Sequence, residues 1–299
     1  MSSLDLTPEH PPFGKQRPYA GVRAVLATMH GKEAAIAPVL FHRLGLVVDT
    51  APALDTDVLG TFTGEIPRVG NIRDAAIAKA RLGMTATGWP IGIASEGSYG
   101  PHPHIPFMAA GVELLVLVDD TRSIVVSEHL VEDLPVYEHV FAESIDDLRG
   151  FLDRIKFPDH AVIVKPADSG IGEGSVKKGI RTTDDLASAI VQCSACSRDG
   201  KALIQTDMRA HMNATRMASL SRLASAFARR IATPCPACAM PGYGRVGTEI
   251  GLPCEDCGTP SIMARHRIFG CSTCEHSEKR PRPDGRTHAG PGCCPRCNP

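Results

Sequence analysis

Cysteines with the spacing of metal ligands are concentrated at the C-terminal end of the chain. Nine of the eleven cysteines lie after residue 234, and eight of them form four Cys-x-x-Cys pairs. A two-residue gap lets both thiolates of a pair point at one ion, and two pairs complete a tetrahedral set of sulfur ligands. We therefore predict two zinc ions. The predicted ligands are Cys235, Cys238, Cys254, Cys257, Cys271, Cys274, Cys294 and Cys297.

The spacing leaves open which cysteine pairs share an ion. Intervals of fifteen, thirteen and nineteen residues separate the four pairs, and sequential pairing fits the spacing usual in zinc ribbons. The stretch Ser261–Phe269 has the pattern of a hairpin between the second and third pairs, which favours a nested arrangement. Cys293 adds a further thiol or an alternative to Cys294. Four thiolates leave no open coordination position, so both zinc ions are expected to be structural.

Polar side chains also follow a short apolar stretch that ends at Ala94. The segment from Trp89 to Pro103, WPIGIASEGSYGPHP, has the pattern of a buried strand followed by a loop rich in glycine and proline. Such a loop is a common place for a site in an α/β sheet, although a surface turn has the same composition. A carboxylate there could hold a metal ion or a water molecule. The polar side chains of this loop are Ser95, Glu96, Ser98, Tyr99, His102 and His104.

A loop near the N-terminus has the features of an anion site. The expected strand Val22–Ala27 runs directly into the segment Thr28–Lys32, which contains His30, and a helix is expected over Glu33–Leu44. Free N–H groups at the start of a helix, together with Lys32, would bind an anion. The spacing differs from that of a P-loop, and a solvated lysine in the first helical turn is the alternative interpretation.

Two segments between residues 60 and 85 could complete such a site. The segment Gly60–Arg68 is rich in glycine and hydroxyl groups and carries Glu65. It would form a second wall for a phosphate or a sugar, or else a capped loop. The helix expected over roughly Ile72–Thr85 carries Lys79.

A polar loop before the last long helix carries Asp207, Arg209 and His211. The helix expected from about Ala214 to Ile231 has a continuous apolar face, which indicates a structural role. Structural ion pairing and substrate contact fit the loop equally well, and it could meet the Glu96 loop at the end of the sheet. We predict a shared cleft in which Glu96, Asp207 and His211 are catalytic. Its predicted substrate-binding residues are Thr28, His30, Lys32, Glu65, Lys79, Ser95, Ser98, His102 and Arg209.

The order of these motifs over about residues 22–100 resembles the N-terminal half of inosine-triphosphate pyrophosphatases. The resemblance implies that Thr28, Lys32 and Lys79 contact phosphate and that Glu96 holds magnesium. It also implies that the substrate is a nucleotide or another phosphorylated small molecule. Met29-His30 stands where that family has an asparagine, and Ser95-Glu96 replaces its paired aspartates.

Two other resemblances cover different parts of the chain. The motifs ATMHGKE, GTFTGEIPR, ASEGSYGPHPHIPF and TDMRAHMNATRM and the C-terminal CNP together resemble an uncharacterised bacterial protein family, which implies no activity. The stretch FPDHAVIVKPADSGIGEGSVKKGI resembles the lysine strand and glycine-rich loop of ATP-grasp ligases. In that interpretation Lys165 would hold the phosphates of ATP beneath the segment Asp168–Ser175. Since too few residues follow before Asp207 for the metal-binding part of those ligases, a glycine-rich hairpin loop is the preferred interpretation.

Length and composition indicate one large domain and one small domain. The 299 residues can bury a substantial core, and the composition changes to proline, glycine and cysteine at Thr233. We expect a loose tail over residues 1–19 and a mixed α/β sheet with flanking helices over 20–232. Within the sheet, Glu113–Asp119 and Ile124–Glu128 are expected to pair antiparallel. A small zinc-ribbon domain with two sites is expected over 233–299.

Charge and hydropathy restrict the partners and the compartment. The net charge of −1 gives no overall basic field for nucleic acid, and no apolar run is long enough to span a membrane. The N-terminus lacks the apolar core of a signal peptide, and paired cysteines without an export signal fit a reducing, cytoplasmic compartment. The ribbon could nevertheless bind nucleic acid or a protein through local basic side chains. These are Arg265, Arg267, Lys279, Arg280, Arg282, Arg286 and Arg296.

Two classes of function follow from these patterns. In the first, the chain is a metal-dependent phosphohydrolase, similar to a nucleotide pyrophosphatase, with Mg²⁺ on Glu96 and an appended structural zinc ribbon. In the second, it is a non-catalytic protein whose ribbon recognises nucleic acid or another protein.

Overall fold

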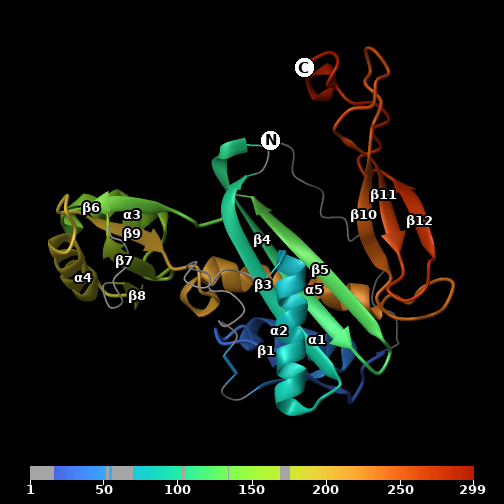
Figure 1. The fold of residues 1–299 in the computed structure, drawn as a ribbon, viewed down its shortest axis with the longest axis horizontal. Helices are drawn as coiled ribbons and strands as arrows, with labels where there is room; N and C mark the ends of the chain where they lie inside the picture. The colour runs from blue at the N-terminus through green and yellow to red at the C-terminus, as the bar shows by residue number, and fades with distance from the viewer. Residues whose placement is uncertain (1–16, 52–53, 56–69, 103–104, 134, 169–175) are drawn as a thin grey trace.

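The computed structural model describes residues 17–299 apart from 52–53, 56–69, 103–104, 134 and 169–175. Three sheets follow one another along the chain. Figure 1 shows the largest sheet in the middle, with a smaller four-stranded sheet on one side of it and the cysteine-rich strands on the other. The architecture is therefore the predicted α/β class, with a mixed sheet and flanking helices ahead of a cysteine-rich end.

The central sheet has the strand order β2-β1-β3-β4-β5. Strand β1 pairs parallel with both β2 and β3, whereas β3, β4 and β5 form an antiparallel meander. The turn over Asp119–Ser123 joins β4 and β5 as the sequence predicts. The strands are β1 (Arg23–Ala27), β2 (Val47–Thr50), β3 (Ile91–His102), β4 (Ile105–Asp119) and β5 (Ile124–Asp133).

Helices cover both faces of the central sheet. On one face, α1 (Glu33–Leu44) and α5 (Ala214–Ala232) bury a core that includes Phe227. On the other face, α2 (Ile72–Thr87) packs alanines and Met84 against β1, β3 and β4. Since β2 and β3 lie on opposite sides of β1, the crossovers through α1 and α2 run in opposite directions. The carboxyl ends of β1 and β3 are thus a topological switch point, where open α/β sheets bind ligands.

The segment after Ala94 is not a loop. Strand β3 continues to His102 because it pairs with β4 along this whole stretch. Its glycines serve close packing instead of a turn: a Cβ on Gly97 would lie 2.5 Å from the Arg216 guanidinium. In the same way, a Cβ on Gly111 of β4 would lie 2.4 Å from the Tyr99 ring. Glycine is present at these two positions because the Arg216 and Tyr99 side chains pack directly against the strand backbone.

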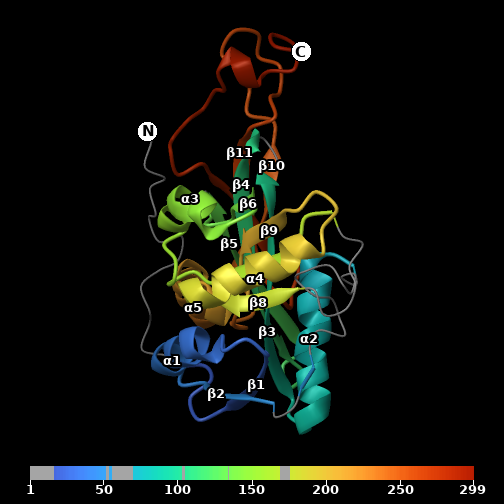
Figure 2. The same ribbon diagram turned by 90° about the vertical axis from the view of Figure 1, so that its left-hand side faces the viewer.

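The region expected to be one α/β sheet contains a second sheet with its own core. This antiparallel sheet has the order β6-β9-β7-β8, and α3 (Arg149–Arg154) and α4 (Thr183–Ala195) pack on it. Figure 2 shows α4 and β8 in front of the central sheet. The strands are β6 (His139–Ala142), β7 (Val162–Pro166), β8 (Lys177–Ile180) and β9 (Ala202–Thr206). Short 3-10 turns cover Ile145–Leu148, Ala210–Met212 and Pro291–Cys293.

Tyr19 belongs to the core, although the sequence analysis assigned it to a loose tail. Its side chain is fully buried, and its hydroxyl donates a hydrogen bond to Asp119 at 2.8 Å. Arg122 stacks over the Tyr19 ring and pairs with the same carboxylate. Ordered structure therefore begins before residue 20.

The cysteine-rich end is built on an antiparallel sheet of β10 (Gly244–Ile250), β11 (Ala264–Gly270) and β12 (Ser277–Pro281). The stretch Ser261–Phe269 does not form the expected hairpin, because most of it lies in the single strand β11. Strand β10 follows α5 directly, and the C-terminal residues form the tip farthest from the central sheet in Figure 1.

Candidate functional site

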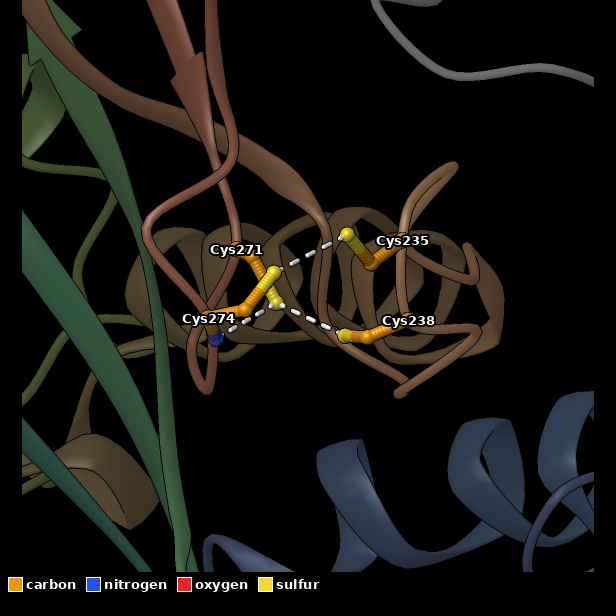
Figure 3. A group of neighbouring side chains, drawn as sticks. All are labelled: Cys235, Cys238, Cys271 and Cys274. Atoms are coloured by element: carbon orange, nitrogen blue, oxygen red, sulfur yellow. Dashed lines mark hydrogen bonds between the residues drawn. The ribbon is translucent and has the colours of Figure 1, made fainter.

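The first group of side chains that could hold a metal ion is Cys235, Cys238, Cys271 and Cys274. Their sulfur atoms all lie within 4.8 Å of one another, and Figure 3 shows the four side chains converging from two knuckles. The Cys235 and Cys274 sulfurs are 3.7 Å apart, and those of Cys238 and Cys271 are 3.6 Å apart. Zn–S bonds of about 2.3 Å in a tetrahedron require sulfur separations of roughly 3.8 Å. The observed spacing therefore fits one tetrahedral metal ion.

The second group is Cys254, Cys257, Cys294 and Cys297, with the same geometry. Its sulfur separations run from 3.4 Å to 3.9 Å. Cys293 is in neither group, so Cys294 is the ligand. Within the part of the chain that the structure describes, these two tetrads are the groups of three or more residues that could hold a metal ion.

The pairing is interleaved, and both pairings considered from the sequence are wrong. The first pair joins the third and the second joins the fourth. The cause is the strand between successive pairs: β10, β11 and β12 each carry the chain from one end of the small sheet to the other. Successive cysteine pairs therefore alternate between the two ends, and the sheet separates the two metal sites.

Backbone N–H groups prepare several thiols for ionisation. Burial tends to raise the pKa of Cys271, but N–H donors from Cys274 and Thr273 outweigh it and lower the pKa to about 6. Hydrogen bonds from Thr259 likewise lower the pKa of Cys257 to about 6. The lowered pKa favours the thiolate, the form that binds a metal ion, at one position in each tetrad. The pKa of a second thiol in each tetrad, Cys238 and Cys297, is raised to about 12.

A second cluster of polar side chains lies at the switch point between β1 and β3. The Lys32 ammonium, at the start of α1, donates to the Ser95 hydroxyl at 2.9 Å. Lys79 of α2 forms a 2.6 Å ion pair with Glu96. All four residues are buried. Because β1 ends at Ala27, the backbone of β3 beyond Ala94 has no parallel neighbour on that side, and the Lys32 ammonium reaches the Ser95 carbonyl there.

Burial also changes the charge state of this cluster. Desolvation lowers the pKa of Lys32 to about 8, with the Arg216 guanidinium as the next largest cause. Desolvation and the nearby Lys32 charge lower the pKa of His30 to about 4, so this imidazole is neutral at pH 7. The His30 ring stacks on that of His211, with ring centres 5.4 Å apart. Burial lowers the pKa of His211 in the same direction.

Arg216 connects α5 to the central sheet through a buried network. Its guanidinium contacts both carboxylate oxygens of Glu113 and donates to the Met208 carbonyl. The Tyr99 hydroxyl donates to Glu113 at 2.6 Å. Arg216 and Glu113 are 3 % and 1 % exposed, so each charge depends on its partner. Sequence reasoning missed Glu113, and the signal available was one carboxylate at the start of an otherwise apolar strand.

The loop before α5 joins the second sheet to this cluster. Asp207 is fully buried and forms a 2.6 Å ion pair with Arg209. It also accepts a hydrogen bond from the Gly179 N–H on β8 at 3.1 Å. Arg181 donates to the His211 carbonyl. These contacts bring His211 and Arg209 to the same end of the central sheet as Lys32.

The sheet divides the residues predicted to line one cleft. Ser95, like Glu113, lies on the α1/α5 face, where His30, Lys32 and His211 gather, whereas Glu96 lies on the α2 face with Lys79. Thr28 accepts a hydrogen bond from the His30 N–H within its own loop, and Ser98 is exposed. Glu65 and the His102 side chain lie outside the described residues.

The basic residues of the small sheet are largely paired with acids. Lys279 pairs with Glu249 at 2.7 Å, Arg280 with Glu278, and Arg282 with Asp284 at 2.5 Å. Arg280 also lies over the Phe269 ring at 4.2 Å. These contacts stabilise the small sheet and reduce the positive field that the sequence suggested for it.

The fold and the two tetrads define a class: an α/β protein with a C-terminal region built for two metal ions. Within that class the chain belongs to the family described as a domain of unknown function (DUF6671), whose model matches residues 79–299. The predicted membership of an uncharacterised family is confirmed. A comparison with curated proteins gave no match. The resemblance to inosine-triphosphate pyrophosphatases stays a prediction, as does the division into domains.

Among the described residues, none of the helices combines the length and the apolar character needed to cross a bilayer.

Proposed function

We propose that the protein is a phosphohydrolase that acts on a nucleotide or another phosphorylated small molecule at the switch point of the central sheet. The observation that carries this proposal is the gathering of Lys32 and Arg209 around a neutral His30 at the carboxyl ends of β1 and β3. Cations there would neutralise phosphate oxygens, and the start of α1 adds backbone N–H groups.

His30 is the group best suited to accept a proton in this reaction. Its pKa of about 4 keeps it neutral at pH 7, and it stacks on His211 beside Lys32. In the proposed step, a water oxygen attacks phosphorus, the bond from phosphorus to the leaving oxygen breaks, and His30 takes the water proton. The leaving oxygen takes its proton from solvent. Lys32 and Arg209 stabilise the charge on the phosphate oxygens.

Glu96 takes a different role from the one predicted for it. Its carboxylate is held by Lys79 at 2.6 Å on the α2 face. We therefore assign Glu96 to orienting Lys79 at the edge of the site, in place of binding Mg²⁺. Asp207 similarly positions Arg209.

We assign zinc to both cysteine tetrads. The support is the sulfur geometry, four thiolates in each set and sulfur separations near the value that tetrahedral zinc requires. Each set of four ligands closes the coordination sphere, so these ions stabilise the fold and take no part in the reaction.

A second candidate function is ATP binding in the manner of ATP-grasp ligases. Val162 and Val164 of β7 face the core beneath α3 and α4, so Lys165 lies on the opposite face of that sheet. Such a lysine could contact phosphates bound between the two sheets. Its glycine-rich neighbour 169–175 lies outside the described residues.

The test is release of phosphate and pyrophosphate by the purified, zinc-loaded chain from a panel of nucleoside mono-, di- and triphosphates and sugar phosphates. We expect turnover of at least one compound, and a His30→Gln variant should lose about 100-fold in kcat because the proton acceptor is removed. An exposed residue provides the control, His129→Gln, which should retain full activity. Absence of turnover across the panel, with tight ATP binding that Lys165→Gln abolishes, would replace the first candidate by the second.

A further inference from the structure

A polar cavity of about 580 Å³ separates the central sheet from the cysteine-rich sheet. It lies on the α2 side of β5 and is bounded across from β5 by β10. Its size is within the range of sites for small molecules. The lining residues are Arg73, Val125, Ser127, His129, Arg230, Arg245, Val246, Gly247, Thr248, Cys271 and Ser272.

Arg230 spans the gap between the edges of the two sheets. Its guanidinium donates to the Ser127 carbonyl on β5 at 2.6 Å and to the Arg245 carbonyl on β10 at 2.9 Å. Strand β5 is an edge of the central sheet, and β10 is an edge of the small one. The side chain therefore satisfies carbonyl groups of both edges and keeps the sheets apart, which leaves the cavity beside it.

Positive charge dominates the walls. Arg73, in the first turn of α2, donates to the Ser127 hydroxyl at 3.3 Å, and Arg245 donates to the Thr248 hydroxyl at 2.7 Å. Arg230 also forms an ion pair with Glu128 of β5 at 3.6 Å. Among the described residues that line the cavity, three are arginines and none is acidic. Burial lowers the pKa of Arg230, the Glu128 carboxylate acts to raise it, and the Arg73 charge lowers it further.

We propose that this cavity binds the phosphate group of a small phosphate monoester, with Arg73 and Arg245 as its principal ligands. Guanidinium groups donate two parallel hydrogen bonds to a phosphate, and a dianion would offset the excess positive charge of the walls. The hydroxyls of Ser127 and Thr248, which accept hydrogen bonds from Arg73 and Arg245, can donate their own protons at the rim. A ligand with a carboxylate in place of the phosphate carries one negative charge and would offset less of the positive charge of the walls.

The cavity is distinct from the switch-point site. Arg216 and Arg230 are fourteen residues apart on α5, so the two sites lie about 21 Å apart along that helix. A ligand in the cavity would contact α2, β5 and β10 together. It would thereby tie the cysteine-rich region to the central sheet, next to the first metal tetrad.

Titration calorimetry of the full, zinc-loaded chain with glycerol phosphate tests the proposal, and inorganic phosphate and sulfate serve as further probes. We expect saturable binding that Arg73→Gln and Arg245→Gln each weaken at least 10-fold. Arg81→Gln, which removes an exposed arginine of the same helix, should leave the affinity unchanged. Lys32→Gln should also leave this binding unchanged, which separates the cavity from the switch-point site.

Arg73 is exposed, so its replacement tests the site even where a change at Arg245 disturbs β10. Binding that survives both the Arg73 and the Arg245 replacement would overturn the proposal. It would equally be overturned by wild-type protein that shows no saturable binding at millimolar glycerol phosphate, or by an Arg81→Gln variant weakened as much as Arg73→Gln.

Discussion

The central sheet and the cysteine-rich sheet are held together by different forces. The central sheet buries apolar side chains on both faces, including Leu26, Ile93 and Leu117 beneath α1 and α5. The small sheet has a modest apolar cluster around Cys235, Tyr243 and Phe269, and its other interactions are mostly surface ion pairs. Folds with so little core usually require metal ions or disulfides. In the cysteine-rich sheet, the two tetrads therefore take the stabilising role that the hydrophobic core has in the central sheet.

Metal removal should have the largest effect on stability, and it should affect the two regions differently. Structural zinc contributes roughly 10 kcal/mol per ion to the folding of such a region. We expect a strong chelator to unfold residues 233–299 while the central sheet keeps a cooperative thermal transition. Trp89 is the single tryptophan and stacks with Arg23 beside β1, so its fluorescence reports the central sheet alone. Cobalt substitution should give the absorption bands of tetrahedral thiolate sites.

Single cysteine substitutions test the interleaved pairing of the two tetrads. Cys238→Ser should release one of two zinc ions and leave the second tetrad loaded, as measured by metal analysis of the purified chain. Cys257→Ser should do the reverse, and a Cys238/Cys271 double change should cost little more than either single change. If each single variant lost one ion and the double variant lost both, the result would support a different pairing. Cys193→Ser, at a cysteine outside both tetrads, is the matched control.

The buried pair of Arg216 and Glu113 should have the next largest effect, and it acts on the central sheet. Glu113→Gln leaves the guanidinium buried without its countercharge, which costs about 3 kcal/mol or more. Denaturant unfolding followed by Trp89 fluorescence measures this loss. The control is Asp120→Asn at the exposed pair with Arg81, for which we expect at most about 1 kcal/mol. Equal losses of stability in Glu113→Gln and Asp120→Asn would contradict the burial of the pair of Arg216 and Glu113.

Acid should weaken the central sheet through histidines that fold in their neutral form. The folded pKa of His30 is about 4, below its ordinary value of 6.5, so the unfolded chain binds a proton that the folded chain does not. Stability is therefore complete above pH 6.5 and falls as the pH drops toward 4, by about 2 kcal/mol at pH 5. His30→Gln should flatten this slope in Trp89-monitored unfolding. A slope that is unchanged in the variant would show that His30 does not fold neutral.

The cysteine-rich region shows what spacing can and cannot predict. The spacing identified all eight residues of the two tetrads, because a Cys-x-x-Cys pair is a local structure that needs no knowledge of the fold. Which two Cys-x-x-Cys pairs bind the same ion depends on how many strands lie between them, and the spacing does not show that number. Reading Ser261–Phe269 as a hairpin added a strand crossing that the chain does not make, and the pairing that followed from it was wrong.

The switch-point cluster shows the complementary limit. Local patterns located β1, α1 and α5, since these have clear apolar patterns. The polar, glycine-rich half of β3 had no such pattern. Gly97 of β3 makes room for Arg216 from the distant helix α5, and Gly111 of the facing strand β4 makes room for Tyr99, and a single sequence does not display these contacts. For the same reason, the division of Ser95 and Glu96 between opposite faces appears only with the full strand.

The most direct measurement of the central claim is the kcat/KM of Lys32→Gln on the best substrate of the phosphate-release panel, compared with Lys201→Gln. Lys201 lies on the second sheet's surface and pairs weakly with Glu143 at 4.0 Å. The account predicts a loss of about 100-fold for Lys32→Gln, since one charged donor to the phosphate disappears, while the variant keeps a cooperative Trp89-monitored unfolding transition. Lys201→Gln should keep full activity. Equal activity of the two variants would contradict a phosphohydrolase site at the switch point.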